Sequence, residues 1–275
     1  MSVSLRTIGP VMLVGAGKMG LALARGWLDA GLAPSNLVLV DPSPSPEARA
    51  LAADYELPLH AEGAGLLPNV LVLAVKPQII DAVMETLQPV IGPQTLVVSI
   101  AAGIDIARLT RGMDSGRVVR TMPNTPAQIG KGVTGAVAGP DVDADERATV
   151  DALLAAAGMV VWLDSEGDLD ALTGVSGSGP AYVFNMVEAM AAAGVQQGLS
   201  PEIAMKLARQ TVIGAAALME AEPAVPAETL RKNVTSPNGT TAAALAVLMA
   251  DDGLTPLMER AVAAARKRTE ELGRA

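Results

Sequence analysis

Hydrophobic residues up to residue 166 occur in short, nearly continuous runs that alternate with stretches of helical spacing. Continuous rather than alternating runs are typical of parallel strands that helices cover on both faces. Helices are predicted between the runs, at roughly 18–30, 45–54, 78–88, 104–110 and 144–157. The predicted strands are Val11–Val14, Leu37–Val40, Val70–Val75, Leu96–Ile100 and Val118–Arg120, with Val133–Val137 and Val160–Leu163 as candidates for later strands.

Strand signals stop after residue 166, and the remaining sequence has helical character. Ser200-Pro201-Glu202 supplies an N-cap, a proline at the first helical position and an acid in the first turn, and the Ala-rich helix then runs to Met219. Thr255-Pro256 repeats the start signal, and Gly273 lies where a C-cap is expected. The stretches Gly174–Pro180 and Thr235–Gly239 are expected to interrupt the helices.

The predicted fold class is α/β, with a Rossmann-type doubly wound sheet in residues 1–166 and an all-α domain in residues 167–275. Long Ala-rich helices with few aromatic residues are poorly suited to a free-standing domain of this size. We therefore predict a homodimer at least, with the helical half forming most of the interface.

Composition excludes several classes of function. Hydrophobic residues make up 50% and charged residues 18% of the chain, which predicts a large core. The net charge of -9 without a marked basic run disfavours nucleic-acid binding. No cysteine and a single histidine, His60, leave no metal site of the usual kind. Without a signal-peptide pattern or a long apolar stretch, we expect a cytoplasmic protein and no membrane partner.

The stretch Gly15-Ala16-Gly17-Lys18-Met19-Gly20 lies between the first predicted strand and helix, where a dinucleotide-binding loop belongs. In such loops Gly15 permits the tight turn, Gly17 lets the backbone approach a pyrophosphate, and Gly20 allows close packing of helix on strand. The amides at the helix start then face the anion. The alternative is a glycine turn with a purely structural role.

Asp41 ends the second strand, about twenty residues after the glycine loop. An acid there accepts hydrogen bonds from the ribose of NAD and repels the extra phosphate of NADP. Ser43 and Arg49, however, could contact that phosphate, and a capping role is an alternative for Asp41. The coenzyme is therefore NADPH or NADH, and Asp41 by itself favours NADH.

Two further strand ends carry candidate chemistry, because ligands bind at the carboxyl edge of such sheets. The third strand ends in Ala74-Val75-Lys76-Pro77, where Lys76 is either a contact for coenzyme or substrate or an ordinary exposed lysine. After the fourth strand, Ala101, Ala102 and Gly103 are small, as a nicotinamide lying over this edge requires.

Four stretches, taken with the glycine loop, resemble the pyrroline-5-carboxylate reductase family and span nearly the whole chain in the family's order. The last of them looks like the signature by which the family is usually recognised. The stretches are Leu73–Gln78 (LAVKPQ), Arg120–Pro126 (RTMPNTP), Thr173–Tyr182 (TGVSGSGPAY) and Leu230–Thr241 (LRKNVTSPNGTT).

The resemblance implies NAD(P)H-dependent reduction of the cyclic imine 1-pyrroline-5-carboxylate to L-proline, the last step of proline biosynthesis. It also implies a helical dimerisation domain, an active site built across the dimer, and assembly into a larger ring such as a decamer. The threonine matching Thr241 is expected to hydrogen-bond the imine nitrogen, while Ser236 and the amides around Gly239 and Thr240 hold the carboxylate. Asn238 replaces a common glycine, but asparagine tolerates left-handed backbone geometry.

These residue types suit the chemistry. A protonated imine is already electrophilic, so hydride transfer needs orientation more than a strong acid. A turn of amides and hydroxyls at a helix N-terminus suits a carboxylate, although helix capping is the alternative role for Ser236 and Thr241. The expected catalytic residues are Thr241, Ser236 and Lys76, and the expected substrate-binding residues are Ser236, Asn238, Gly239, Thr240 and Thr241. The expected coenzyme-binding residues are Gly15, Ala16, Gly17, Lys18, Met19, Gly20, Asp41, Ser43, Ala74, Val75, Lys76, Pro77, Ala101, Ala102, Gly103 and Asn124.

Two other classes of protein fit less well. β-Hydroxyacid dehydrogenases share the glycine pattern of residues 174–179, but place a catalytic lysine and an asparagine where this chain has Val183 and Val187. Valine cannot carry the proton that an alcohol must lose. A non-catalytic dinucleotide sensor would not need hydroxyl residues clustered in the 236–241 turn or Lys76 at the sheet edge.

Overall fold

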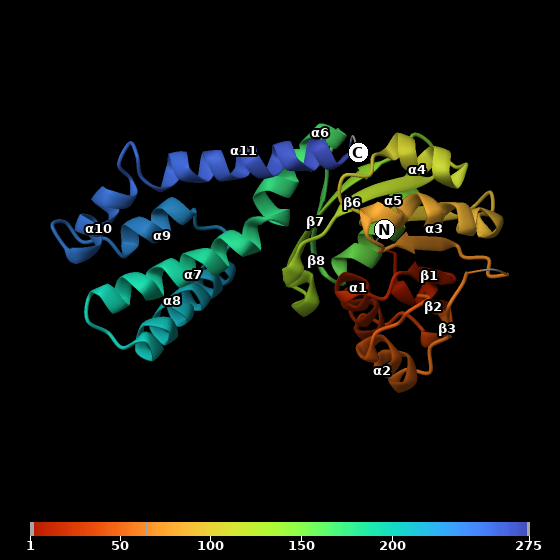
Figure 1. The fold of residues 1–275 in the computed structure, drawn as a ribbon, viewed down its shortest axis with the longest axis horizontal. Coiled ribbons are helices and arrows are strands. Elements are labelled where there is room, and N and C mark those ends of the chain that lie inside the picture. The colour runs from red at the N-terminus through yellow and green to blue at the C-terminus, as the bar shows by residue number, and fades with distance from the viewer. Residues whose placement is uncertain (1–2, 64, 274–275) are drawn as a thin grey trace. The chain divides into compact units, whose positions relative to one another are not determined.

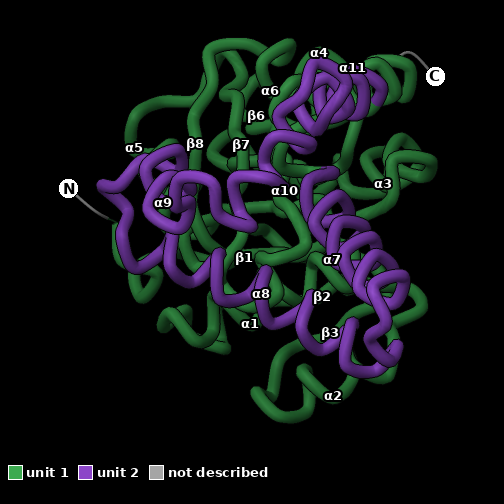
Figure 2. The backbone as a smooth tube through the Cα atoms, turned by 90° about the vertical axis from the view of Figure 1, so that its left-hand side faces the viewer, with its two compact units in different colours: residues 1–177, 265–275 green, residues 178–264 purple. Residues whose placement is uncertain are grey.

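The computed structural model describes residues 3–63 and 65–273, which form two compact units (Figure 1). Unit 1 comprises the described residues up to Gly177 together with those from Ala265 onward. Unit 2 comprises Ser178–Ala264, and Figure 2 shows the two units in different colours. Unit 1 therefore contains the two ends of the described chain, and unit 2 is inserted between them.

Within the described residues, one eight-stranded sheet forms the centre of unit 1, in the order β3-β2-β1-β4-β5-β6-β7-β8. Neighbouring strands are parallel, except that β6 and β7 are antiparallel. This confirms the doubly wound sheet. The strands are β1 Val11–Val14, β2 Leu37–Val40, β3 Leu59–His60, β4 Val70–Leu73, β5 Leu96–Ser99, β6 Val118–Met122, β7 Gly132–Ala138 and β8 Gly158–Trp162.

Two details of the sheet differ from the prediction. The short edge strand β3 was not expected, because two residues carry no readable pattern. The direction of β7 was also not expected, and it follows from the length of the connection before it. Only residues 123–131 join β6 to β7, with the 3-10 helix Thr125–Ile129 among them, whereas a parallel crossover needs about a dozen residues or more.

Helices cover both faces of the sheet and divide its side chains into two cores. Val11 and Leu13 of β1 belong to the core under α1, α2 and α5, and Met12 and Val14 belong to the core under α3 and α4. All four side chains are buried, as the continuous apolar run predicts. The helices are α1 Lys18–Asp29, α2 Pro46–Asp54, α3 Ile80–Leu87, α4 Ile106–Met113 and α5 Ala144–Ala155.

The second half of the chain is helical, as predicted. Ser200 caps α8 by accepting a hydrogen bond from the Ile203 amide at 3.3 Å. Alanines rather than large side chains join α7 to α8. The helices are α6 Glu166–Leu172, α7 Gly179–Gln196, α8 Pro201–Ala221, α9 Ala227–Asn233, α10 Thr240–Leu248 and α11 Leu254–Gly273, of which α6 lies in unit 1 and α11 passes from unit 2 into unit 1.

The two expected helix interruptions have different outcomes. The Thr235–Gly239 stretch is a turn between α9 and α10, as predicted. The prediction for Gly174–Pro180 is wrong in part, because Thr173–Gly177 forms a π-helix that follows α6 directly. Pro180 then lies in the first turn of α7, where its missing N–H leaves no hydrogen bond unmade.

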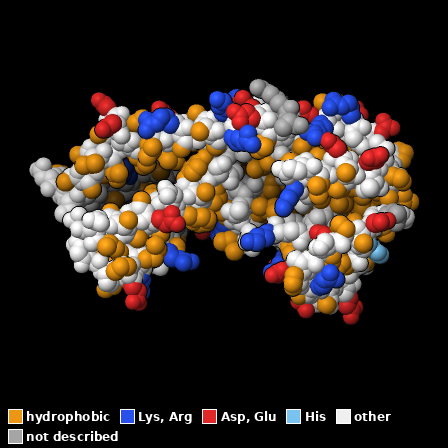
Figure 3. Space-filling view, viewed as in Figure 1, with side chains coloured by type: hydrophobic (Ala, Val, Ile, Leu, Met, Phe, Trp, Pro, Cys, Tyr) orange, Lys and Arg blue, Asp and Glu red, His pale blue; other side chains and the backbone are white. Residues whose placement is uncertain are grey.

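Unit 2 exposes an unusual number of large apolar side chains in the single chain. Phe184 is 63% exposed, Val247 is 71% exposed and Met249 is 59% exposed. Figure 3 shows hydrophobic side chains spread over the visible face of this unit. Large exposed apolar patches on soluble proteins often mark protein contact sites. Among the described helices, none combines the length and apolarity that crossing a membrane requires.

Candidate active site

The sheet has a topological switch point between β1 and β4, since the chain passes from β1 to β2 on one side and later returns to β4 on the other. Ligands of such sheets bind at the carboxyl ends of these strands. The predicted glycine loop leaves β1 there, and Ala74 leaves β4, with the Ala74 amide donating to the Val14 carbonyl at 2.7 Å. The structure thus brings two of the predicted coenzyme-binding segments together.

Glycine is required at the three positions of the loop for different physical reasons. Gly15 has a φ of 96°, and a Cβ on it would lie 2.5 Å from the Ala74 carbonyl oxygen. A Cβ on Gly20 would overlap the Gly15 carbonyl oxygen. A Cβ on Gly17, in contrast, would meet no atom of the described chain within 4 Å. Internal packing therefore explains Gly15 and Gly20, while Gly17 leaves open space in front of α1 that suits a pyrophosphate.

We expect Gly17→Ala to fold like the parent chain but to raise the coenzyme dissociation constant about tenfold, equivalent to about 1.4 kcal/mol. The added methyl group fills only the open space, and the backbone of Gly17 is extended with a φ of -77°. The measurement is coenzyme fluorescence titration together with a thermal melt.

Gly20→Ala is the matched control for this prediction. It should lower the free energy of unfolding by about 1–3 kcal/mol, because its methyl group meets backbone rather than open space. Equal loss of stability in both variants would contradict the distinction between the two glycines.

Asp41 is tied into the loop by its carboxylate. One carboxylate oxygen accepts a hydrogen bond from the Ala16 amide at 2.9 Å, and the other accepts one from the Ser43 amide at 2.8 Å. These contacts support the loop backbone but cap no helix, because the N-cap of α1 is Gly17 and that of α2 is Ser45. A carboxylate has about four acceptor positions, so the same side chain can still accept a hydrogen bond from a ribose hydroxyl.

Removal of the Asp41 charge is expected to change coenzyme preference. We expect Asp41→Ala to raise the ratio of kcat/KM for NADPH to that for NADH by about fivefold, equivalent to the roughly 1 kcal/mol between two charges in water. Asp41→Asn, which keeps one acceptor for the loop amides, separates charge from loop support. An unchanged ratio in both variants would mean that the carboxylate does not face the 2′ position.

An apolar cavity of 410 Å³ lies beside these strand ends. It reaches from Val14 and Val40 to Ala61 and to Val83 and Leu87, all of which line it. An apolar slot next to Asp41, the acid predicted to bind a ribose, suits an adenine ring. The cavity is therefore a candidate adenosine site that the sequence did not locate, because its walls come from four separate segments.

A second cavity, of 490 Å³, is lined by part of the glycine loop and by charged groups. Lys18, Arg25 and Glu47 contribute to its wall. The pKa of the Glu47 carboxyl is held below its usual range, first by a hydrogen bond from its own backbone amide, then by Ser45 and by the two cations. The acid thus stays ionised beside Lys18.

The other predicted strand-end residues lie along the same edge. Lys76 is exposed after the end of β4, just before the 3-10 helix Pro77–Ile79. This exposure is compatible with a contact to coenzyme or substrate and also with an ordinary surface lysine. Ala101 is buried and Ala102 is half-buried, and the Ala101 amide donates to the Ser99 hydroxyl at 3.3 Å. A flat, small-residue edge at β5 results.

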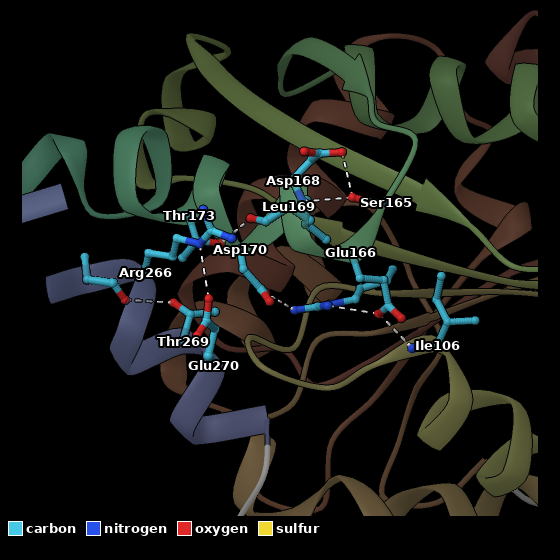
Figure 4. A network of polar contacts seen from close by, with 12 residues as sticks. Ile106, Ser165, Glu166, Asp168, Leu169, Asp170, Thr173, Arg266, Thr269 and Glu270 are labelled. Atoms are coloured by element: carbon cyan, nitrogen blue, oxygen red, sulfur yellow. Dashed lines mark hydrogen bonds and ion pairs between the residues drawn. The ribbon is translucent and has the colours of Figure 1, made fainter. Parts of the chain in front are cut away.

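Arg120, in one of the recognised stretches, lies at the centre of a buried ion-pair network. Its guanidinium, 6% exposed, contacts Glu166 at 2.9 Å and Asp170 at 2.7 Å. Glu166 also accepts a hydrogen bond from the Ile106 amide at the start of α4, at 2.9 Å (Figure 4). The network joins β6, α4 and α6. The sequence contained one signal for it, an arginine inside an apolar strand, which requires buried acids as partners.

Asn124 has both ends of its side-chain amide engaged. Its nitrogen donates to the Ser176 carbonyl at 3.0 Å, and its oxygen accepts from the Val133 amide at 2.9 Å. The side chain thereby joins the end of β6 to β7 and to the π-helix. A coenzyme contact of this side chain, as predicted, would use the second N–H or the second lone pair of the amide.

In unit 2, the predicted substrate turn is built around the start of α10. Asn238 has a φ of 58°, the left-handed geometry that was expected there. Gly239 is the N-cap of α10, and a Cβ on it would overlap the Ser236 hydroxyl oxygen. Since glycine has no side chain to cap the helix, the first amides, which include those of Thr240 and Thr241, are available to an anion.

Comparisons with known proteins agree with this arrangement. Residues 166–272 match the family model described as pyrroline-5-carboxylate reductase dimerisation, and residues 10–103 match the model described as NADP oxidoreductase, coenzyme F420-dependent. Pyrroline-5-carboxylate reductase from Pseudomonas aeruginosa is 41% identical over 265 residues, covering 95% of this chain and 96% of that protein. The enzyme from Synechocystis is 40% identical, covering 95% and 97%.

Solved structures give the same result. A pyrroline-5-carboxylate reductase from Coxiella burnetii has a TM-score of 0.89 and 33% identity, covering 97% of this chain and 99% of that one. The Plasmodium falciparum pyrroline carboxylate reductase, solved with NADP bound, has a TM-score of 0.82 and 29% identity, covering 98% and 99%. Identity of this level across both units shows the family, and the chain belongs to the pyrroline-5-carboxylate reductases.

Proposed function

We propose that this chain reduces 1-pyrroline-5-carboxylate to L-proline with NADPH or NADH, the last step of proline biosynthesis. The observation that carries the proposal is the full-length match to pyrroline-5-carboxylate reductases. The structure adds physical support, because Gly17 and Gly239 give the chain two glycine-capped helices. One suits the pyrophosphate of a dinucleotide and the other suits the carboxylate of the imine substrate.

When bound, the reduced coenzyme supplies the hydride. We propose that the amides of Gly15–Gly20 bind its pyrophosphate, Asp41 accepts from its adenosine ribose, and the small residues 101–103 leave room for the nicotinamide. Lys76, exposed at the same edge, would face coenzyme or substrate. The residues of this unit bind and orient rather than exchange protons.

The turn before α10 would hold the substrate. We propose that the Ser236 hydroxyl and the amides of Gly239 and Thr240 hold the carboxylate, with the backbone of Asn238 shaping the turn. The Thr241 hydroxyl would hydrogen-bond the imine nitrogen and would keep a hydrogen bond to the same nitrogen after reduction to the amine. Because a protonated imine already carries positive charge at the reacting group, fixing its orientation is the main contribution of these residues.

The apolar surface of unit 2 supports a homodimer, which we further propose to assemble into a ring such as a decamer. The family model matched by residues 166–272 is a dimerisation model, and the exposed side chains of α7 and α8 provide the necessary apolar surface. Light scattering on the purified protein tests this. A mass of 27.9 kDa, that of one chain, would contradict the dimer, and a plain dimer would contradict the ring.

The catalytic proposal is tested by mixing the protein with reduced coenzyme and pyrroline-5-carboxylate. Loss of the coenzyme's absorbance that requires the imine, with proline as product, supports the proposal. Coenzyme binding without turnover would favour a sensor. In a separate assay with oxidised coenzyme, oxidation of a β-hydroxyacid would favour the dehydrogenase alternative, for which Val183 and Val187 offer no acid or base.

A further inference from the structure

The end of the described chain lies against the loop that follows β5. Gly103 is buried and has a φ of 77°. A Cβ on Gly103 would lie 3.1 Å from the Leu272 Cβ and 3.2 Å from the Gly273 nitrogen. A Cβ on Gly273 would lie 2.8 Å from the Gly103 carbonyl oxygen. The two backbones therefore pack directly on each other, and both segments belong to unit 1.

The same loop is held at its two ends by side chains. At its start, the Ser99 hydroxyl accepts a hydrogen bond from the Ala101 amide. After it, the Glu166 carboxylate accepts one from the Ile106 amide, and Arg120 holds that carboxylate in place. The middle of the loop, at Gly103, packs against α11. Ala102, beside it, is half-buried.

The last turns of α11 form a regular helix with hydrogen bonds and an ion pair between its side chains and successive turns. Thr269 is 7% exposed, and its hydroxyl donates to the Ala265 carbonyl at 3.2 Å (Figure 4). Arg266 pairs with Glu270 at 3.1 Å, one helical turn further along. The helix continues to Gly273, so Leu272 and Gly273 reach Gly103 from a formed helix.

We infer that Leu272 and Gly273 are positioning residues for the nicotinamide half of the coenzyme. By packing against Gly103, they fix the position of the Ala101–Gly103 loop. The glycine loop and Asp41 bind the adenosine half independently. The inference rests on the proposed function, since it assumes that the coenzyme's reactive ring lies over this loop.

The test compares two ligands that share the adenosine half. We expect Gly273→Ala to weaken binding of the preferred reduced coenzyme about fivefold, and Gly273→Val about tenfold or more, because displacement of a positioning group by a fraction of an ångström is costly. ADP-ribose, or its 2′-phosphate if NADPH is preferred, lacks the nicotinamide and should bind within about twofold of the parent value, because no contact to that half changes. Titration calorimetry measures both.

A matched control uses the same substitutions at Gly167, an exposed glycine in α6 whose Cβ would meet only the Ser165 hydroxyl at 3.7 Å. Neither ligand should be affected there. Unchanged coenzyme binding in both Gly273 variants, or equal weakening of the two ligands, would overturn the inference. Failure of the parent protein to bind or oxidise any nicotinamide coenzyme would instead overturn the proposed function, and the inference with it.

The melting temperature separates positioning from stability. Alanine is a better helix former than glycine by about 1 kcal/mol in a helix interior, but its methyl group at position 273 would lie 2.8 Å from the Gly103 carbonyl oxygen. The two effects on stability oppose each other, so Gly273→Ala should shift the melting temperature only slightly while coenzyme binding falls. A fall in kcat that accompanies the weaker binding at an unchanged melting temperature would support the inference. A lower melting temperature with both ligands weakened would contradict it, because that pattern indicates a general loss of structure.

Discussion

Thr241→Ala is expected to lower kcat about a hundredfold, the usual cost of removing one positioned hydrogen-bonding group, while coenzyme affinity stays within about twofold. In the proposed arrangement the Thr241 hydroxyl touches the imine and not the dinucleotide. Thr241 lies in the first turn of α10, but the N-cap of that helix is Gly239, so loss of the Thr241 hydroxyl leaves the N-cap unchanged. Steady-state kinetics and a coenzyme titration give the two quantities separately.

Thr241→Ser is the conservative partner of that variant, because it keeps the hydroxyl and loses only a methyl group. It should recover most of the activity. An equal loss of turnover and of coenzyme affinity in Thr241→Ala would mean that the hydroxyl faces the dinucleotide. Failure of serine to rescue would point to packing by the methyl group instead.

The largest effect on stability is expected for Arg120→Met. Removing one partner of a buried ion pair costs about 3–5 kcal/mol, because the remaining charges lose their partner. Here Glu166 and Asp170, both on α6, would be left without their cation. Urea denaturation, followed by the fluorescence of Trp27 and Trp162 in unit 1, measures the change.

Two comparisons test the cause of this loss. The triple variant Arg120→Met with Glu166→Gln and Asp170→Asn should regain part of the stability, since it leaves no unpaired charge. Arg108→Met breaks the ion pair with Asp81, whose side chain is 62% exposed, and should change stability by less than about 1 kcal/mol. If Arg108→Met costs as much as Arg120→Met, burial is not the cause.

The Asp81 pair also predicts a pH dependence. Hydrogen bonding to Arg108 holds the pKa of the Asp81 carboxyl below its usual range. A lowered folded-state pKa means that the small contribution of this pair is present above the ordinary pKa of an aspartate and is lost as the pH falls below it. Because the pair is exposed, its contribution to the free energy of unfolding is small. The difference in unfolding free energy between the parent and Arg108→Met should therefore be small near neutral pH, and it should disappear only in acid, where Asp81 is protonated.

Sequence patterns predicted most of the sheet, because each buried parallel strand is a continuous apolar run that needs no partner to be recognised. They did not predict that β7 is antiparallel, since an apolar run carries no direction. The short connection through Thr125–Ile129 decides that direction, and loop length was the available signal.

For the site, the patterns located the loops but not what holds them. The glycine loop was readable because turn geometry and anion binding require glycine at fixed spacing. The contact of Gly103 with Gly273 could not be predicted from the sequence, because it joins distant positions through backbone atoms. Nor could spacing show that Asn124 has both ends of its amide engaged by backbone groups.

Because unit 2 is inserted into unit 1, the chain cannot finish folding in the order in which it is synthesised. Domains generally fold from the N-terminus as they leave the ribosome. Here the sheet of unit 1 emerges early, but the part of α11 that contacts Gly103 emerges only after all of unit 2. A nascent chain would therefore carry an incomplete predicted coenzyme edge until α11 has left the ribosome, and a product terminated before α11 would lack that support.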